Sequence, residues 1–218
     1  MKKKVAVIAL ICVVFVLLAI LAGYMILTRG GSYVKSKSDY SSDNTIYFLQ
    51  NDPQWADEQL GNSSFMMAGS GCLTTCIATE LLMQHIQVPE MQNVTESDSG
   101  TAITPGSLNE FFSKQGVYDS EGNIQWTELE KALSVQVVKL KSDGLTHYKL
   151  DTLLSEGVFP IAYVRVNGNG NYHFVLIIGS KDGEYFCMDP LNENKDAVPL
   201  SRFGDKIYSI RYITEKTT

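Results

Sequence analysis

The sequence predicts an α+β fold in which a helical first half packs on an antiparallel sheet. In the first half, apolar residues recur at helical spacing after Cys72, which predicts a helix from about residue 72 to residue 86. In the second half, strand-like apolar runs alternate with short turns from Val158 onward, as at the Asn- and Gly-rich residues 167–171. Because such tight connections join antiparallel neighbours, we expect an antiparallel sheet there.

Turn and cap residues set the bounds of the other predicted elements. Thr104 is a suitable helix cap, Pro105 suits a first helical position and Gly116 a helix end, so a second helix is predicted between them. Two shorter helices are predicted at residues 124–133 and 150–156. A short strand is predicted at residues 46–49, and longer strands at residues 159–166, 172–179, 184–188 and 206–213.

The chain begins with a positively charged end, residues 1–4, followed by an apolar run of 23 residues, 5–27. At about 1.5 Å per residue this run is long enough to cross a hydrocarbon core of about 30 Å. It lacks a small-residue cleavage site, so we interpret it as an uncleaved transmembrane anchor; the alternative is a signal peptide with an atypical cleavage site. The lysines are expected to stay in the cytoplasm, which places the rest of the chain outside it, in a single-pass cell-membrane protein.

The remainder of the chain divides into a linker and one domain. Residues 28–44 are rich in Gly, Ser, Lys and Asp and are predicted to be a flexible linker. Residues 45–218 are one domain's worth of chain. They contain 12 Lys and Arg against 22 Asp and Glu, a net charge of −10, whereas the whole chain carries −6. A nucleic-acid partner is therefore not expected, because phosphate binding needs clustered positive charge. The oligomeric state is left undefined by the sequence.

Cys72 follows the small residues Gly69, Ser70 and Gly71 and opens the first predicted helix. Unpaired N–H groups and the positive dipole end at a helix start stabilise a thiolate, which makes a cysteine there a candidate nucleophile. The two glycines are expected to allow a sharp turn and the close approach of a substrate backbone. The alternative is a buried structural cysteine, since free cysteine is among the most buried residue types.

Of the three histidines, His173 is the candidate for chemistry. His85 and His147 lie in polar surroundings and are expected to be solvated. His173 begins a strongly apolar strand directly after the turn at residues 167–171, where the alternative is a structural histidine at a sheet edge. Asp189 ends the next strand, so neighbouring strands would bring its carboxylate within reach of the imidazole; the alternative is a plain Asp-Pro turn.

Gln50 lies ahead of a turn, upstream of Cys72. Such a residue is usually a surface amide, but a glutamine placed upstream of a nucleophilic cysteine can supply an oxyanion donor.

Taken in order, these segments resemble the papain-like bacteriocin-processing cysteine peptidase family of the double-glycine type, and more closely its stand-alone members. The resemblance covers nearly the whole outer domain. It rests on Gln50-x-Asp52-Pro53-x-Trp55, Gly71-Cys72, Thr104-Pro105-x-x-Leu108-Asn109, Gly157-x-x-Pro160, His173-Phe174-Val175-Leu176 and Asp189-Pro190. No membrane bundle or nucleotide-binding domain follows in this sequence, so the exporter-coupled role of the family does not carry over.

The resemblance implies a papain-like fold and hydrolysis of peptide bonds through a thioester. Cys72 would act as the thiolate nucleophile beside protonated His173, and Asp189 would orient the imidazole. Gln50 and the Cys72 backbone N–H would receive the oxyanion. The substrate would be a peptide or protein, and no cofactor or metal would be needed. A zinc site is not expected, because the cysteines and His173 lack paired short ligand spacings.

Two other function classes remain open. One is an amidase of cell-wall peptides on a related fold, although no wall-binding module is visible. The other is a binding or scaffold protein without turnover, against which the four filled positions argue. The sequence does not name the substrate. Specificity is expected in the loops at residues 63–69, 90–103 and 167–171, and the acidic composition weakly favours basic peptides.

The remaining cysteines of the outer domain are expected beneath the site. Cys76 follows Cys72 by one helical turn, and Cys187 precedes Asp189 by two residues on a strand, which points both toward the same side. We therefore expect Cys76 and Cys187 to lie near each other, either as a disulfide or as two packed thiols.

Overall fold

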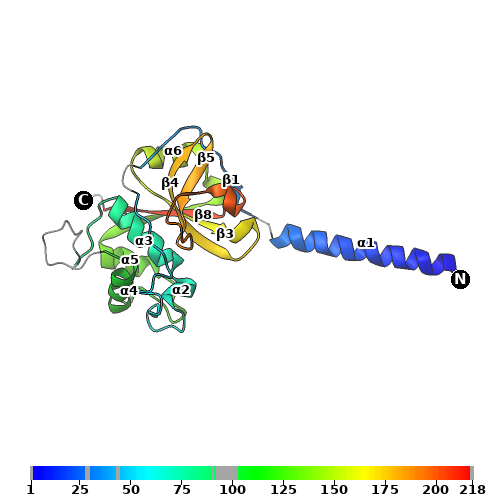
Figure 1. The fold of residues 1–218 in the computed structure, drawn as a ribbon, viewed down its shortest axis with the longest axis horizontal. Helices are drawn as coiled ribbons and strands as arrows, with labels where there is room; N and C mark the ends of the chain where they lie inside the picture. Colours follow the sequence, from blue (N-terminus) through cyan, green and yellow to red (C-terminus); the bar gives the residue numbers. More distant parts are fainter. Residues whose placement is uncertain (1, 28–29, 43–44, 90, 92–102, 217–218) are drawn as a thin grey trace. The chain divides into compact units, whose positions relative to one another are not determined.

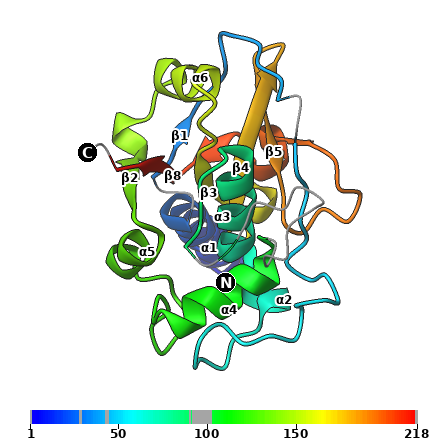
Figure 2. The ribbon, with the colours of Figure 1, turned by 90° about the vertical axis from the view of Figure 1, so that its left-hand side faces the viewer.

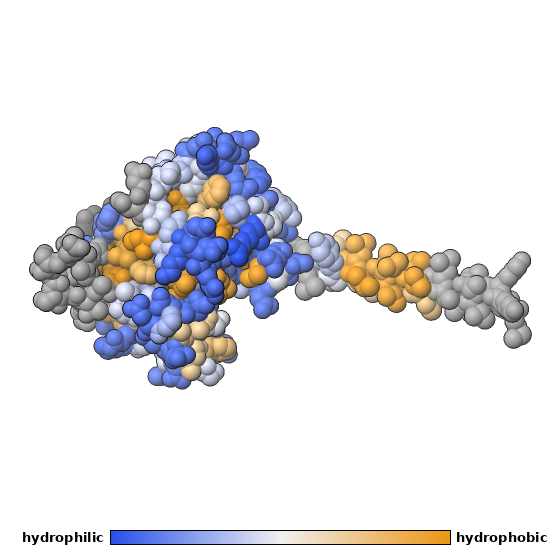
Figure 3. Space-filling model, in the orientation of Figure 1, coloured by the Kyte–Doolittle hydropathy of each residue, from blue (hydrophilic) through white to orange (hydrophobic). Residues whose placement is uncertain are grey.

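The computed structural model describes residues 2–27, 30–42, 45–89, 91 and 103–216. The chain separates into two compact units, Met1–Gly30 and Gly31–Thr218. The first unit contains helix α1, Lys2–Leu27, whose side chains are described for residues 11–25. Most of these are large, apolar and exposed, as the colouring of Figure 3 shows. Among the residues that the structure describes, no helix meets the length and apolarity needed to cross a membrane. The anchor stays a prediction.

The second unit is an α+β domain, which confirms the predicted fold class. Its main sheet has six strands in the order β2-β8-β3-β4-β5-β6, with antiparallel pairing throughout. The strands are β2 (Val135–Lys141), β3 (Ile161–Arg165), β4 (Tyr172–Lys181), β5 (Glu184–Met188), β6 (Val198–Pro199) and β8 (Ser209–Glu215). A two-stranded sheet pairs β1 (Ser32–Tyr33) with β7 (Lys206–Ile207).

The helices lie mainly in the first half of the domain, as expected. They are α2 (Met67–Ser70), α3 (Cys72–Met83), α4 (Pro105–Lys114), α5 (Trp126–Leu133) and α6 (His147–Ser155), with short 3₁₀ turns η1 (Ser142–Gly144), η2 (Val166–Gly168) and η3 (Leu200–Phe203). In both ribbon views α2 and α4 lie at one end of the domain and α6 at the other (Figures 1 and 2). Helix α3 packs against β4, which joins the two halves.

Local chemistry explains where the helices begin and end. The Thr104 side chain accepts a hydrogen bond from the Ser107 backbone N–H, and the Ser107 hydroxyl accepts one from the Thr104 N–H, which forms a capping box in front of Pro105. Helix α5 ends at Ser134, which adopts the left-handed conformation. Strand β2 begins directly after it and was not predicted; the adjacent Val137 and Val138 interrupt its alternation of apolar and polar residues.

One predicted strand at the edge of the domain is wrong and another is interrupted. Residues 46–49 do not form a strand; the backbone N–H of the next residue, Gln50, instead donates to the carbonyl of Pro190 at 3.0 Å. The predicted strand at residues 206–213 is divided between β7 and β8. This division lets one segment pair with both sheets.

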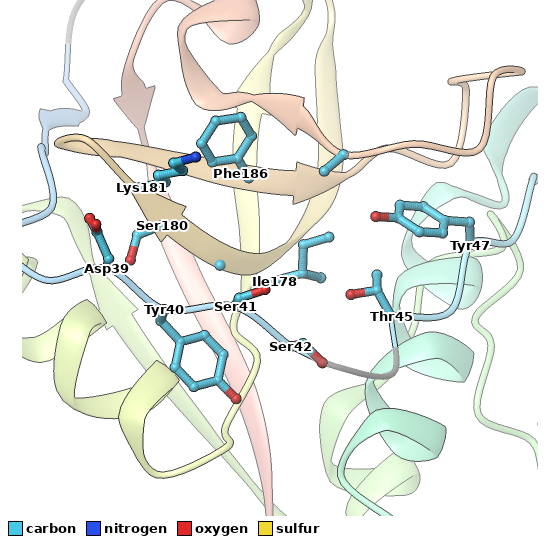
Figure 4. Close-up of a pocket in the computed structure, with 12 residues that line it drawn as sticks. Asp39, Tyr40, Ser41, Ser42, Thr45, Tyr47, Ile178, Ser180, Lys181 and Phe186 are labelled. Carbon is cyan, nitrogen blue, oxygen red and sulfur yellow. The ribbon is translucent and has the colours of Figure 1, made fainter.

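The predicted linker is wrong for residues 31–42, which lie against the domain. Val34 and Ser36 are buried, and the Ser36 hydroxyl donates to the Asp151 carboxylate at 2.8 Å. Tyr40 forms an antiparallel bridge with Ser180 of β4. Figure 4 shows this segment beside β4 and β5, where it borders a hollow of about 600 Å³. The composition of residues 31–42 does not reveal these contacts, because they depend on residues elsewhere in the chain.

Helix α3 is the most deeply buried helix that the structure describes, and a carboxyl group ties it to the sheet. Glu80 is fully buried, and its Oε1 accepts hydrogen bonds from the Ile213 backbone N–H at 2.6 Å and from Gln84 Nε2 at 2.9 Å. Burial raises the pKa of Glu80 to about 8, although both hydrogen bonds oppose the shift. The carboxyl group is therefore largely protonated at neutral pH.

Gly71 separates α2 from α3 and is required for space. Its φ of −80° is open to any residue, so the turn itself needs no glycine. A Cβ at this position would lie 2.6 Å from the Met67 carbonyl oxygen and 2.8 Å from the Met67 sulfur. At Gly69 a Cβ would meet nothing within 4 Å. The close packing of Gly71 thus fixes how Cys72 enters its helix.

We expect Gly71→Ala to destabilise the domain by about 1–3 kcal/mol, because the added methyl group overpacks a site next to backbone. Gly69→Ala is the matched control and should change stability far less. Urea unfolding of both variants measures the difference. Equal stability of the two variants would contradict the packing argument.

Candidate active site

Cys72 is the first residue of α3 and lies at the edge of a cleft. Its side chain is half-buried, and the Gly71 carbonyl accepts the Thr75 N–H at 2.9 Å to close the first helical turn. The cleft has a volume of about 360 Å³ and is bordered by the start of α3, the loop before α5 and strands β2, β3, β4 and β8. A thiol at a helix start that opens on a cleft is placed for reaction with a bound substrate.

His173 and Asp189 form a buried pair beside this cysteine. His173 Nε2 lies 2.7 Å from Asp189 Oδ1, and both residues are about 95% buried. The backbone N–H of Leu191 donates to the same Asp189 oxygen at 3.0 Å. Because Nε2 is hydrogen-bonded to the Asp189 carboxylate, Nδ1 is the ring nitrogen that can interact with Cys72.

The charges of the pair stabilise each other. Burial lowers the pKa of His173, but hydrogen bonding and charge interactions with Asp189 and Cys72 outweigh it and raise the pKa from 6.5 to about 9. Burial raises the pKa of Asp189, yet His173, the Leu191 N–H and Arg202 lower it below its ordinary value. The favoured state of the pair at neutral pH is therefore an imidazolium next to a carboxylate, with Cys72 on the other side of the ring.

Gln50 is buried between α2 and the loop after Asp189. Its Nε2 donates to the Ala68 carbonyl at 2.7 Å, and its backbone N–H donates to the Pro190 carbonyl. Its Oε1 is buried without a hydrogen-bond partner among the residues described. Nε2 of the Gln50 side chain carries two N–H groups, and only one of them is used in the hydrogen bond to Ala68. The structure brings Gln50 into the same region as the pair, whereas its role as an oxyanion donor stays a prediction.

The other histidines lie apart from this chemistry, whereas the charge of Asp189 acts on both Cys76 and Cys187. His85 and His147 are exposed, as expected. Cys76 and Cys187 are fully buried and free, so the disulfide is not formed. The Cys76 thiol contacts the Phe174 carbonyl oxygen at 3.5 Å, and burial raises the pKa of both thiols. Among the described residues, no three His, Cys, Asp or Glu side chains are grouped to hold a metal ion.

The walls of the cleft are largely residues that the sequence analysis did not single out. Residues 63–69 and 167–171 do not line it, and most of residues 90–103 lie outside the described residues. The side chains that line it instead include Trp126, Lys139, Tyr163, Phe174 and Arg211. The last four share one signal, the alternation along β2, β3, β4 and β8, which becomes informative only once the strand register is known.

Comparisons with known proteins add a distant structural likeness. No protein-family model matches the sequence, and no curated protein sequence matches it. Among solved structures, the domain is similar to the crystal structure of a candidate C39-like peptidase from Bacillus anthracis. The two are 17% identical with a TM-score of 0.47, and the match covers 83% of this chain and 100% of the other.

The raised pKa of His173 makes stability depend on pH. A histidine whose pKa rises on folding contributes stability that is full below about pH 6.5 and is lost as the pH rises through about 9. Asp189→Asn removes the charge that holds the proton. We therefore expect the difference in urea midpoint between wild type and Asp189→Asn to be largest below about pH 6.5 and to shrink toward about pH 9.

The control is Asp182→Asn, at an exposed turn between β4 and β5, which should change the midpoint little at every pH. A difference between wild type and Asp189→Asn that stays constant over this range would contradict the charged pair.

Proposed function

We propose that this protein is a cysteine peptidase that hydrolyses peptide bonds through a Cys72 thioester. The observation that carries the proposal is the buried His173–Asp189 pair, 2.7 Å apart, which interacts with a half-buried thiol at the start of α3. Nucleophile, base and orienting carboxylate come from α3, β4 and the end of β5. This is the arrangement that acyl transfer by a thiolate requires.

In the first step the Cys72 thiolate attacks the carbonyl carbon of the scissile bond. Negative charge moves to the carbonyl oxygen, where the Cys72 backbone N–H and the uncommitted N–H of Gln50 donate hydrogen bonds. As the carbon–nitrogen bond breaks, His173 gives its Nδ1 proton to the leaving amine. The products of this step are the free amine and a thioester on Cys72.

In the second step water hydrolyses the thioester. Neutral His173 accepts a proton from water through Nδ1 as the oxygen attacks the thioester carbon, and the carbon–sulfur bond then breaks. This releases the carboxylic acid and restores the thiolate and the imidazolium. Asp189 stays ionised throughout and keeps Nε2 protonated, so that Nδ1 always faces the reacting atoms.

We further propose that the peptidase domain works outside the cytoplasm on a membrane anchor. The support is the apolar run at residues 5–27 behind a lysine-rich end. Protease protection in intact cells and in permeabilised cells, with an epitope at the carboxyl terminus, tests this location. An epitope that becomes accessible only after permeabilisation would contradict it.

Cys72→Ala and His173→Ala should each abolish peptide cleavage by the full-length protein while leaving the circular dichroism spectrum unchanged. His173→Ala should also slow alkylation of Cys72 by iodoacetamide, followed by mass spectrometry of the Cys72 peptide, because the imidazolium no longer stabilises the thiolate. His85→Ala, an exposed histidine, is the matched control and should behave as wild type. Cleavage retained in either active-site variant excludes the proposed mechanism.

Gln50→Ala should lower kcat by roughly 10² to 10³, the usual effect of removing one oxyanion donor. The exposed Gln54→Ala is its control and should leave kcat unchanged. Steady-state kinetics on one cleaved peptide measures both. If kcat of Gln50→Ala equals that of wild type, Gln50 has no part in the reaction.

A further inference from the structure

Two cations face the cleft from neighbouring strands. Lys139 of β2 and Arg211 of β8 are direct partners in the antiparallel register, and both line the cleft that holds Cys72. Like charges placed directly opposite each other across strands destabilise a sheet unless something neutralises them. The protein keeps this pair at its candidate active site.

The setting of Arg211 does not neutralise its charge. Its guanidinium lies over the Trp126 ring, 4.3 Å from the ring centroid, which orients the side chain and leaves its positive charge in place. The residue is half-buried, and burial lowers the pKa of the guanidinium although Tyr163 opposes the shift. Among the described residues neither Lys139 nor Arg211 forms an ion pair.

The residues described as lining the cleft also carry no carboxylate charge that could neutralise these cations. No Asp or Glu is among the lining residues, although the domain as a whole is strongly acidic. Tyr163 lines the cleft together with Cys72 and Arg211; burial raises its pKa, Cys72 raises it further and Arg211 opposes the shift. Phe174 lies directly opposite Tyr163, and Ser209, two residues before Arg211, is the other partner of Tyr163. One face of the sheet therefore runs from the thiol to the cations.

We propose that Lys139 and Arg211 bind an acidic side chain of the peptide substrate while its scissile bond lies at Cys72. This inference rests on the proposed function and names the substrate class. A guanidinium held over the Trp126 ring presents its N–H groups as a fork that matches a carboxylate, and Lys139 adds a second charge. The local charge of the cleft reverses the expectation of basic peptides drawn from composition.

The experiment uses the full-length protein and a peptide library in which each position in turn carries Glu, Gln or Lys, with cleavage read by mass spectrometry. We expect one position at which Glu raises kcat/KM at least about tenfold over Gln, the size of a hydrogen-bonded charge pair. Arg211→Met and Lys139→Met should each reduce that preference, because they lower kcat/KM for the Glu peptide far more than for the matching Gln peptide. That split separates recognition of charge from a structural effect.

Two further variants sharpen the result. Arg211→Lys keeps a charge without the fork and should retain part of the preference. Lys181→Met removes an exposed cation from the far end of β4, away from this cleft, and should retain all of it. Lys139 is exposed on an edge strand, so Lys139→Met tests the proposal even if Arg211→Met fails to fold.

Cleavage without any preference for Glu, or a preference that survives in the Lys139→Met and Arg211→Met variants, overturns this inference and leaves the peptidase proposal intact. If the wild type cleaves no peptide and Cys72 alkylates no faster than in His173→Ala, the proposed function fails and this inference fails with it.

Discussion

The structure depends on the burial of α3 against β4, because this contact brings the candidate nucleophile to the candidate base. Nine of the twelve residues of the helix are buried, so packing fixes its position along most of its length. Its first residue, Cys72, is the point at which the helix reaches the cleft. The Cys76 contact with Phe174 and the Glu80 contact with Ile213 fix the helix to two strands.

The other half of the site is held by the strand pairing. His173 lies opposite Val164 on β3, and Asp189 follows directly after β5, which pairs with the later part of β4. A bulge between Ile177 and Gly179 shifts the register of that pairing. The backbone hydrogen bonds between the strands thus bring His173 and Asp189 together. Because the pair is buried, removing one partner would leave the other as an uncompensated buried charge, which is strongly destabilising.

The sequence was informative where local chemistry decides structure. The cap at Thr104, the helix after Cys72 and the hairpin before His173 all follow from residues close in the chain.

The features that the sequence did not reveal depend on partners that are distant in the chain. Residues 31–42 were expected to be a linker because their apolar content is low, yet Val34 and Ser36 are buried against segments more than a hundred residues away. Gly71 was expected to serve a turn, but Met67 requires its small size. Arg211 and Lys139 became candidates only when the register placed them opposite each other.

The buried Glu80 has a consequence for the energetics of folding. Oε1 accepts both hydrogen bonds, so Oε2, which has no partner among the described residues, carries the proton. With a pKa raised from 4.5 to about 8, the folded domain holds a proton at neutral pH that the unfolded chain has released. Folding therefore takes up a proton, and its calorimetric enthalpy will vary with the ionisation enthalpy of the buffer. Through the buried carboxyl group of Glu80, the stability of the helix that carries Cys72 thus depends on pH.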